Sequence, residues 1–283
     1  MNATEIETAP VTAAMIARYA VSALMEELHL SPKPGLVDLE SSGCHHDLNL
    51  QIMTASAQSL FETFQYMALA AKGKVPSQAL REQLAAIGRY GEQQMLNVTG
   101  NVNTHKGAIW CVGLLSAAAS IHLNNGVDFS CQDLLTTAGQ IASYDDRHNP
   151  LKVTNGDIVR GKYEVVSARE EAKTGFPALR NTALPTWEKY AHEPKDVQRL
   201  NVLLSLMAVV DDTCILHRSG MNVLRNIQRK SRSIIENGGL SVNLNWLNYN
   251  ALSQYITNNW VSPGGSADLL SATIFIKKIT TNS

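Results

Sequence analysis

The sequence predicts an all-α protein, folded as a single orthogonal bundle of about ten helices. Apolar residues recur at three- and four-residue steps along most of the 283 residues, as Ile16, Tyr19, Ala20 and Leu24 do near the start. The alternation of apolar and polar residues that marks a half-buried strand is almost absent. No Asn-Gly or Asp-Gly hairpin joins two alternating runs.

The expected helices are amphipathic or apolar runs separated by turn-forming residues. In chain order they are 11–30, 50–71, 77–96, 108–123, 131–144, 176–190, 196–216, 223–236, 245–258 and 267–279. The first run ends before Pro32 and Pro34, because a residue that precedes proline is driven out of the helical region. The most apolar run, from Ala108 to Ala119, is too short to cross a bilayer and is expected to be a core helix.

A long loop is expected near residues 148–160, where Asn149-Pro150 and Asn155-Gly156 predict turns. No internal repeat of fixed period divides the chain. One bundle of this size is more economical than two small ones, so residues 1–283 are predicted to form a single all-helical domain.

The composition excludes several classes of protein. Lys and Arg total 24 against 25 for Asp and Glu, without the basic excess of a nucleic-acid-binding protein or a polybasic membrane anchor. The four cysteines lie far apart and form no C-x-x-C pair, which is typical of reduced core thiols rather than of a disulfide framework or a zinc site. The acidic N-terminus shows no secretory signal, and a cytoplasmic location is expected.

Polar residues that suggest chemistry gather in loops and at helix ends. The first such loop carries Lys33 and Asp38 within Ser31-Pro-Lys-Pro-Gly-Leu-Val-Asp38, and then Asp47 within Gly43-Cys-His-His-Asp47. Loops on a rigid scaffold commonly carry binding and catalytic residues. The alternative is a rigid connector with incidental polar residues.

A second loop, Thr99-Gly-Asn-Val-Asn-Thr-His-Lys-Gly107, leads into the most apolar helix. Asn103 or Thr104 can cap that helix, which places His105 and Lys106 in its first turn. Cations there oppose the helix dipole unless they bind an anion together with the free backbone N–H groups. The alternative is that Lys106 extends into water and His105 is neutral.

The run 203–216 is apolar around nearly its whole circumference, yet it carries Asp211 and Asp212 near its expected C-terminal end. Burying two uncompensated carboxylates is costly, so we expect a cation beside them or a proton on them. Mg²⁺ suits such hard oxygen ligands. An ion pair with Arg218 or another basic residue is the alternative.

Two further segments combine charge with helix-breaking residues. Residues 167–177 carry Arg169 and Glu171 before a Gly-Phe-Pro break, and a solvated helix face would also explain them. Ser262-Pro-Gly-Gly-Ser-Ala-Asp268 opens the last helix. Its glycines either let the backbone approach a phosphate or only shape the turn.

Taken in order, these segments resemble the triphosphoribosyl-dephospho-coenzyme A synthase family over nearly the whole chain, from Ser31 to Leu270. Several ordered motifs make a far more specific match than any one of them alone. The segments that carry the resemblance are Pro32-Lys-Pro-Gly-Leu-Val-Asp38, Gly43 with His45 and Asp47, Val102-Asn-Thr-His-Lys-Gly107, Ala168-Arg169 with Glu171-Ala172, Gly175-Phe-Pro177, Asp212-Thr213 with Arg218, and Ser262-Pro-Gly-Gly-Ser-Ala-Asp-Leu-Leu270.

Within that family the sequence is more similar to the branch that serves malonate decarboxylase than to the branch that serves citrate lyase. Cys214 and Ser219 stand where the citrate branch more often has Asn and Gly, and Asn101 stands where a second glycine is common. The segments closest to the malonate branch are Cys44-His-His-Asp-Leu48, Gly91-Glu-Gln-Gln-Met-Leu96, Lys106-Gly-Ala-Ile-Trp110 and Asp212-Thr-Cys-Ile-Leu-His-Arg-Ser-Gly220.

The resemblance implies a reaction in which ATP and 3′-dephospho-CoA give 2′-(5″-triphosphoribosyl)-3′-dephospho-CoA and adenine. A separate transferase would then place this prosthetic-group precursor on an acyl carrier protein. An oxocarbenium-like transition state needs negative charge nearby, a base for the entering hydroxyl and a donor for the leaving nitrogen. The intact triphosphate needs Mg²⁺ and cationic groups. A homodimer is compatible with the resemblance.

The resemblance also implies roles for individual residues. Phosphate contacts are expected from Lys33, Lys106, Arg169 and Arg218, and His105 is expected to contact a phosphate or to donate a proton. Mg²⁺ coordination and general-base catalysis are expected to be shared among Asp38, Asp47, Glu171 and Asp212. Asn103, Ser266 and Asp268 are expected to position ribose or phosphate. Asp212 is the first choice for the base, because a buried helix can hold it rigidly and raise its pKa.

Two other functions remain open on the sequence. His46-Asp47 suggests a helical metal-dependent phosphohydrolase, although such a site needs further His and Asp ligands on helices. A non-catalytic scaffold that binds nucleotides or carrier proteins is the other, although it would not need paired carboxylates in an apolar segment.

Overall fold

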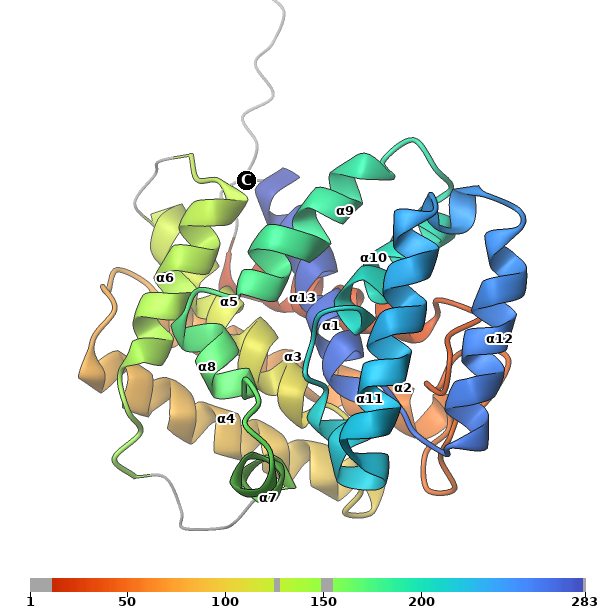
Figure 1. Ribbon diagram of the computed structural model, residues 1–283. Coiled ribbons are helices and arrows are strands. Elements are labelled where there is room, and N and C mark those ends of the chain that lie inside the picture. Colours follow the sequence, from red (N-terminus) through yellow and green to blue (C-terminus); the bar gives the residue numbers. More distant parts are fainter. Residues whose placement is uncertain (1–11, 125–127, 149–154, 282–283) are drawn as a thin grey trace, which may run out of the picture.

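The computed structural model describes residues 12–124, 128–148 and 155–281, and the regular elements in these ranges are all helices (Figure 1). Helices α1 to α6 cover Ala13–Leu28, Leu50–Ser59, Phe61–Ala71, Gln78–Thr99, Lys106–Asn124 and Cys131–Ser143. Helices α7 to α13 cover Asn155–Lys162, Ala168–Lys173, Leu184–Lys189, Lys195–Met207, Thr213–Glu236, Asn245–Asn258 and Gly264–Thr281. A π-helical turn, η1 (Leu179–Ala183), precedes α9, and a 3₁₀ turn, η2 (Gly239–Ser241), precedes α12. The predicted all-α bundle is confirmed.

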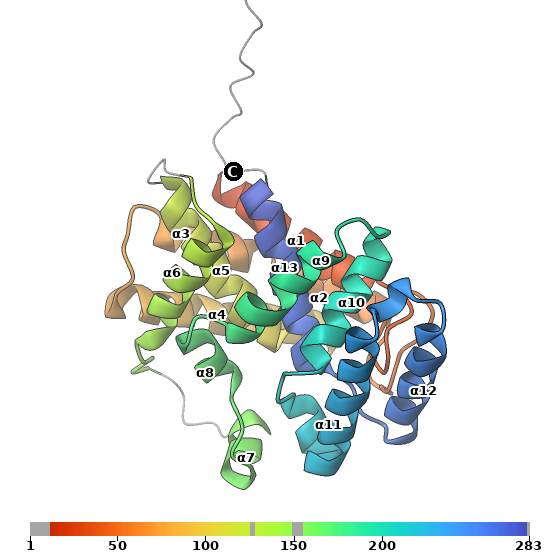
Figure 2. The same ribbon diagram turned by 45° about the horizontal axis from the view of Figure 1, so that its top comes forward.

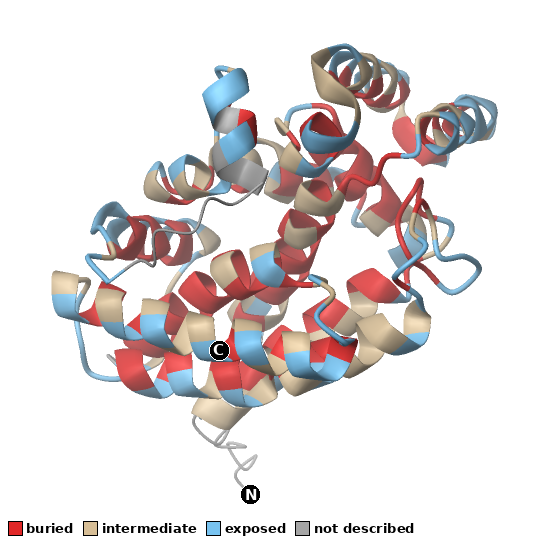
Figure 3. Cartoon of the chain, turned by 90° about the horizontal axis from the view of Figure 1, so that it is seen from below, coloured by how far each residue is buried: buried red, intermediate tan, exposed pale blue. Residues whose placement is uncertain are grey.

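Helices α5 and α13 form the centre of the bundle. α5 packs against α1, α3, α4, α6 and α13, and its residues from Ala108 to Ile121 are almost all buried. α13 runs between the group α3–α6 and the group α10–α12 (Figure 2), and the buried faces of the helices turn inward around both (Figure 3). In the described part of the chain α5 is the one helix long and apolar enough to cross a membrane, but 72% of its most apolar window is buried inside the protein.

The helix expected over 50–71 is divided at Leu60. Leu60 ends α2 with φ −87° and ψ −1°, and its carbonyl accepts the N–H of Phe64 as α3 begins. Ser59 at this junction donates its hydroxyl to the carbonyl of Ser56 at 2.7 Å. A serine that hydrogen-bonds back to the helix competes with the backbone and bends it.

The prediction of one helix over 196–216 is wrong in its second half. α10 ends at Met207, and α11 begins at Thr213 with Asp212 as its N-cap. Asp212 therefore lies at the positive end of a helix dipole, where a carboxylate is stabilised. α11 then runs through the gap expected near 217–222, with a kink at Gly220 where φ is +75°. Apolar periodicity continues across a cap, which is why it did not reveal the break.

The long loop expected near 148–160 is only partly a loop. Helix α7 begins at Asn155 and packs against α11, with Val159 buried. Residues 149–154 lie outside the described residues. Asn155-Gly156, which predicted a turn, instead begins a helix, since Asn and Gly are also tolerated where a helix starts.

Candidate functional site

The N-termini of three helices that are distant in sequence meet at one place. Asp212, the N-cap of α11, is hydrogen-bonded to Ser266 in the first turn of α13. Asp268, also on α13, lies against Gly107 in the first turn of α5. Helix N-termini carry partial positive charge and free N–H groups, so this junction is suited to carboxylates and to anionic ligands.

The Asp212 carboxylate is buried, 2% exposed, and held by several donors. Its Oδ1 accepts the N–H of Cys214 at 3.0 Å, and its Oδ2 accepts the N–H and the hydroxyl of Ser266 at 2.9 and 3.2 Å. Burial raises the pKa of Asp212, and these donors oppose that effect. A Cβ on Gly265 would come within 3.2 Å of Oδ2, so the glycine gives the carboxylate its space.

The carboxylate of the neighbouring Asp211 is compensated by a basic residue. Its carboxylate lies 3.7 Å from the guanidinium of Arg225 and accepts a hydrogen bond from Gln228 at 3.3 Å. Its Oδ2 accepts the N–H of Val166 at 3.4 Å. Asp211 thus has the basic partner expected of a structural ion pair, whereas Asp212 is satisfied by neutral donors.

Asp268 is half-buried in α13 and has fewer donors than Asp212. A Cβ on Gly107 would collide with its Oδ2, so only glycine lets this carboxylate reach the start of α5. Burial raises the pKa of Asp268 well above its ordinary value, Glu27 and Asp212 raise it further, and the N–H of Ala108 opposes them. Asp268 is therefore the carboxyl group of the junction that is readiest to accept a proton.

Glu27 was not among the predicted residues, yet it lies beside Asp268. The Lys33 ammonium donates to Glu27 Oε1 at 2.5 Å and to the Glu27 carbonyl at 2.7 Å, and both side chains are buried. Lys33 would have to leave this ion pair to contact a phosphate. The sequence signal was a carboxylate at helical spacing from Ala20 and Leu24, on the buried face of α1.

His105 is 4% exposed and connects the junction to α2. Its Nδ1 is hydrogen-bonded to the Ser56 hydroxyl at 2.7 Å, and that hydroxyl also contacts the Thr104 hydroxyl. Its Nε2 is buried and has no hydrogen-bond partner among the described residues. Burial, and then the charge of Lys33, lower the pKa of His105 to about 4. The ring is therefore neutral at neutral pH, with one nitrogen left for a ligand.

The Asp38 carboxylate holds its own loop together. It is buried, and its Oδ2 accepts the N–H of Lys33 at 2.7 Å. Its Oδ1 accepts the N–H groups of Glu40 and Ser41 at 2.9 and 2.8 Å. These bonds place Lys33 for its contact with Glu27, so Asp38 acts on the site through the loop backbone.

His45, Asp47 and Arg218 meet at the exposed rim of the site. The Arg218 guanidinium donates to His45 Nδ1 at 3.3 Å, and that nitrogen lies 3.8 Å from Asp47 Oδ1. The Asp47 side chain is 63% exposed. Beside them His46 stacks on Trp260, with ring centroids 4.6 Å apart. The predicted phosphate ligand Arg218 is thus within reach of a solvent-facing ligand.

The other predicted residues lie on α5, on α8 and in the loop before α5. Lys106 pairs with Glu92 at 3.0 Å, and Asn103 Oδ1 accepts the N–H of Lys106 at 3.3 Å, which confirms Asn103 as a cap. Arg169 pairs with Asp145 at 2.5 Å. The side chains of Lys106 and Arg169 are 46% and 42% exposed, so both can turn toward a ligand.

Glu171 lies where α8 gives way to η1. Its Oε1 accepts the N–H of Ala178 at 2.7 Å. Burial raises the pKa of Glu171, and the bond from Ala178 opposes this. Between these two residues Phe176 has φ +54°, in the left-handed region that bulky residues rarely adopt. Glu171 thus stabilises an unusual turn.

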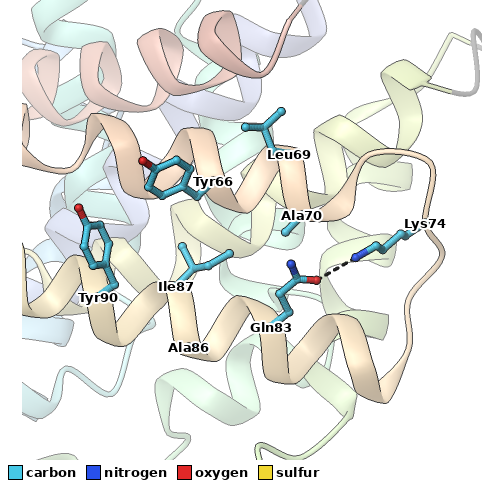
Figure 4. Close-up of a pocket in the computed structure, with 8 residues that line it drawn as sticks. All are labelled: Tyr66, Leu69, Ala70, Lys74, Gln83, Ala86, Ile87 and Tyr90. Atoms are coloured by element: carbon cyan, nitrogen blue, oxygen red, sulfur yellow. Dashed lines mark hydrogen bonds between the residues drawn. The ribbon is translucent and has the colours of Figure 1, made fainter.

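Two hollows on the described surface lie away from these residues. One, of about 640 Å³, lies between α3 and α4 and is lined by Tyr66, Leu69, Ile87 and Tyr90 among others (Figure 4). The other, of about 310 Å³, lies between α9, α10 and α11. Both are shallow and mostly apolar, and neither contains a residue predicted for the site.

The predicted metal ligands do not form one group. Asp38 and Asp212 lend their oxygens to backbone N–H groups, and Asp47 lies at the exposed rim. Among the residues that the structure describes, no three His, Cys, Asp or Glu side chains lie close enough together to hold a metal ion. The residues present thus do not fit a site in which the protein alone holds Mg²⁺.

Comparison with known proteins covers almost the whole chain. A probable 2-(5″-triphosphoribosyl)-3′-dephosphocoenzyme-A synthase from Stutzerimonas stutzeri (strain A1501) is 44% identical over an alignment of 287 positions, which covers 99% of this chain and 97% of that protein. Proteins of the same name from Pseudomonas syringae pv. syringae (strain B728a) and Azotobacter vinelandii (strain DJ / ATCC BAA-1303) are 43% and 39% identical, over 92% and 95% of this chain and 90% and 93% of theirs. No solved structure matches the chain.

The family profile of CitG, described as ATP:dephospho-CoA triphosphoribosyl transferase, matches residues 13–283. That range includes all the helices described above and every residue of the helix junction. The sequence identity and the profile agree on the family that the motifs suggested. The chain belongs to the ATP:dephospho-CoA triphosphoribosyl transferase family.

Proposed function

We propose that this chain transfers the 5-triphosphoribosyl group of ATP to the 2′-hydroxyl of 3′-dephospho-CoA and releases adenine. Membership of the family makes the chain a transferase. The observation that carries the proposal is the pair of carboxylates, Asp212 and Asp268, at the meeting point of three helix N-termini. This arrangement supplies both of the charges that the reaction requires, negative at the sugar and positive at the phosphates.

In this reaction the bond between ribose C1 and adenine N9 breaks, and its electron pair leaves with adenine. A new bond forms between C1 and the attacking 2′-oxygen, which loses its proton to a base. The adenine takes up a proton, so the protons balance. Positive charge develops at the sugar in the transition state, and carboxylates held nearby in a partly buried site stabilise it.

We assign the base to Asp268 and a positioning and electrostatic role to Asp212. The oxygens of Asp212 are already engaged by Cys214 and Ser266, so they are poor acceptors for a further proton. Asp268 has fewer donors, and burial raises the pKa of Asp268 well above its ordinary value. A base titrating nearer to the working pH is the more effective one.

His105 fits a binding role better than that of a strong acid. Burial holds the pKa of His105 at about 4, so an imidazolium is disfavoured there. The tautomer in which Nδ1 accepts from the Ser56 hydroxyl carries its proton on Nε2. We propose that this N–H donates to the leaving adenine or to a phosphate oxygen, which would give the buried Nε2 the partner that it lacks among the described residues.

Three exposed cations are suited to bind the triphosphate. Lys106, Arg169 and Arg218 come from three different elements and keep side chains accessible to solvent. Arginine binds phosphate oxygens through two parallel N–H donors. We propose that these three residues, rather than the buried Lys33, contact phosphate groups.

Mg²⁺ enters this proposal as part of the substrate. Magnesium in nucleotide enzymes keeps several waters and is commonly bound by substrate phosphates with one or two carboxylates. The carboxylates predicted as its ligands are bonded to backbone or lie apart. We therefore propose that the ion arrives on the triphosphate, where it neutralises phosphate charge.

We further propose that the product serves malonate decarboxylase, through a separate transferase that acts on an acyl carrier protein. The sequence supports this through the segments at Cys44, Gly91, Lys106 and Asp212 that resemble the malonate branch. The same reaction serving citrate lyase is the alternative. A cytoplasmic location and a homodimer remain part of the proposal.

Incubation of the purified protein with Mg²⁺, ATP and 3′-dephospho-CoA, followed by mass spectrometry, tests the reaction. We expect free adenine and an adduct that carries an intact triphosphate. Formation of ADP or phosphate would favour a phosphohydrolase, and binding without turnover would favour a scaffold. Either result would overturn the proposal.

A further inference from the structure

Arg81 is a buried cation without a partner. It lies in α4, is 6% exposed, and its guanidinium carbon is 4.9 Å from the centroid of the Trp110 ring on α5. Its Nε is buried and has no hydrogen-bond partner, and no ion pair with Arg81 forms among the residues that the structure describes. None of the sequence motifs includes this residue.

The groups around Arg81 carry more positive than negative charge. Arg89 pairs with Asp146 at 2.6 Å. Arg169 and Lys173 share Asp145, at 2.5 and 3.1 Å. The two aspartates are thus engaged by three cations, and Arg81 is the fourth.

Two more carboxylates border this cluster without compensating Arg81. Glu82, next to it in α4, accepts hydrogen bonds from Arg147 and Gln78. Glu170 accepts from Ser167 in the capping box of α8. Among the residues that the structure describes, the contact of the Arg81 guanidinium is the face of the Trp110 indole ring.

This arrangement is unfavourable in the absence of an anion. Burial lowers the pKa of Arg81, the charges of Asp146 and Asp145 oppose that effect, and the nearby charges of Arg169 and Arg89 lower the pKa further. A cation–π contact contributes about 0.5–2 kcal/mol, and it leaves the buried Nε–H of Arg81 without an acceptor. An oxyanion with several acceptor oxygens would satisfy the free N–H groups of Arg81 and the excess charge together.

The position of Arg81 connects it to the helix junction. Trp110 follows Gly107 by one turn of α5, which corresponds to about 4.5 Å along the helix axis. The indole N–H of Trp110 donates to the carbonyl of Ala168 at 3.1 Å, which places Arg169 beside the same ring. A ligand that reaches Asp268 at the start of α5 can therefore extend a phosphate chain to Arg81.

We propose that Arg81, stacked on Trp110 and assisted by Arg169, binds a phosphate group of a nucleotide substrate. This rests on the proposed function only for the identity of the ligand. The phosphate could belong to the triphosphate of ATP or to the diphosphate of 3′-dephospho-CoA, because both present the same oxygens to the guanidinium.

Titration calorimetry of the wild type and of the Arg81→Gln variant tests the site. Inorganic tripolyphosphate, ATP, 3′-dephospho-CoA and adenosine are the separate ligands. We expect the Kd for tripolyphosphate to rise at least about tenfold, as for the loss of one charge-assisted pair, and the Kd for adenosine to stay unchanged. A rise confined to ATP assigns the triphosphate, and a rise confined to 3′-dephospho-CoA assigns the diphosphate. Because tripolyphosphate binding needs no turnover, this result stands or falls independently of the proposed reaction.

Arg229→Gln is the matched control, since Arg229 is exposed on α11 and bonds only Asn226 among the described residues. It should bind every ligand as the wild type does. Arg81→Gln loses the contact with the Trp110 ring and also removes a buried charge, so it should melt near the wild-type temperature.

Affinities for all phosphate ligands within about twofold of wild type would overturn the proposal. So would a lower melting temperature combined with unchanged binding, which would assign Arg81 to packing alone. Should Arg81→Gln not fold, Arg81→Met preserves the contact with Trp110, and the same measurements decide.

Discussion

Gly107 of α5 leaves open the space that the Asp268 carboxylate of α13 occupies. Two helices that are far apart in the sequence thereby share one carboxylate at their N-termini. The fit requires glycine for lack of a Cβ and not for backbone freedom, because Gly107 does not have a positive φ. Replacing Gly107 with alanine, which adds a single methyl group, therefore tests the role of this glycine.

Gly107→Ala should displace the Asp268 carboxylate. We expect kcat to fall at least about 100-fold, because a displacement of about 1 Å at a catalytic group has that effect. Forced overpacking should lower the free energy of unfolding by about 1–3 kcal/mol. Steady-state kinetics and urea denaturation measure the two effects.

Gly88→Ala in α4 is the matched control. A Cβ there would make ordinary contacts, 3.5 Å from Met67 and 3.8 Å from Ile109. Helix propensity then favours alanine by up to about 1 kcal/mol, so this variant should be at least as stable as the wild type and fully active. Equal activity of the two variants would remove Gly107 and Asp268 from the site.

Asp268→Asn and Asp212→Asn should both be defective, but for different reasons. Removing the base should lower kcat about 10²–10⁴-fold and abolish the acidic limb of the pH profile, since that limb reports the raised pKa of Asp268. Asp212→Asn disturbs a carboxylate that accepts from Ser266, so it should lose rate and keep the acidic limb. Measuring kcat/KM against pH for both separates the roles. Retention of the limb in Asp268→Asn would return the base to Asp212.

The buried ion pair of Glu27 and Lys33 predicts a rescue of folding without rescue of activity. Lys33→Met should lower the free energy of unfolding by about 3–5 kcal/mol, because it leaves the Glu27 carboxylate buried and unpaired. The double variant Glu27→Gln/Lys33→Met should regain most of that stability. It should stay impaired in turnover, because Glu27 raises the pKa of Asp268. Full activity of the double variant would show that the pair is structural only.

The helices and the segments of the site could be predicted from the sequence, since apolar periodicity and ordered motifs are local properties. The position of Asp212 could not be predicted, because the residues around it are apolar on both sides of the break before α11. What begins α11 there is the Asp212 cap, whose Oδ1 accepts the N–H of Cys214 and whose Oδ2 accepts the N–H of Ser266.

Contacts between distant segments explain the rest of what was missed. Glu27 and Arg81 look like ordinary charges of α1 and α4 until the fold brings them to Lys33 and Trp110. Residues that act through a partner remote in sequence leave only a weak local signal.

His105 predicts how stability depends on pH. Its pKa is about 4 in the folded protein against 6.5 for a free imidazole, because burial and Lys33 disfavour the charged ring. Between these values the unfolded chain binds more protons than the folded protein does, so stability rises with pH through this window. The stability that depends on a neutral His105 ring is fully present above about pH 6.5 and is lost as the pH falls toward about 4. It amounts to about 3 kcal/mol, from the size of the shift.

His105→Gln should remove this dependence, since glutamine does not titrate. Carboxyl groups with a raised pKa, such as Asp268, make stability fall as the pH rises. They are present in both proteins, so their effect cancels when the two stabilities are subtracted. Urea denaturation of both proteins from about pH 4.5 to about pH 7.5 measures that difference, which should favour the wild type increasingly as the pH rises. Parallel curves would mean that the folded protein accommodates a charged ring, and Nε2 would then have a partner that satisfies it.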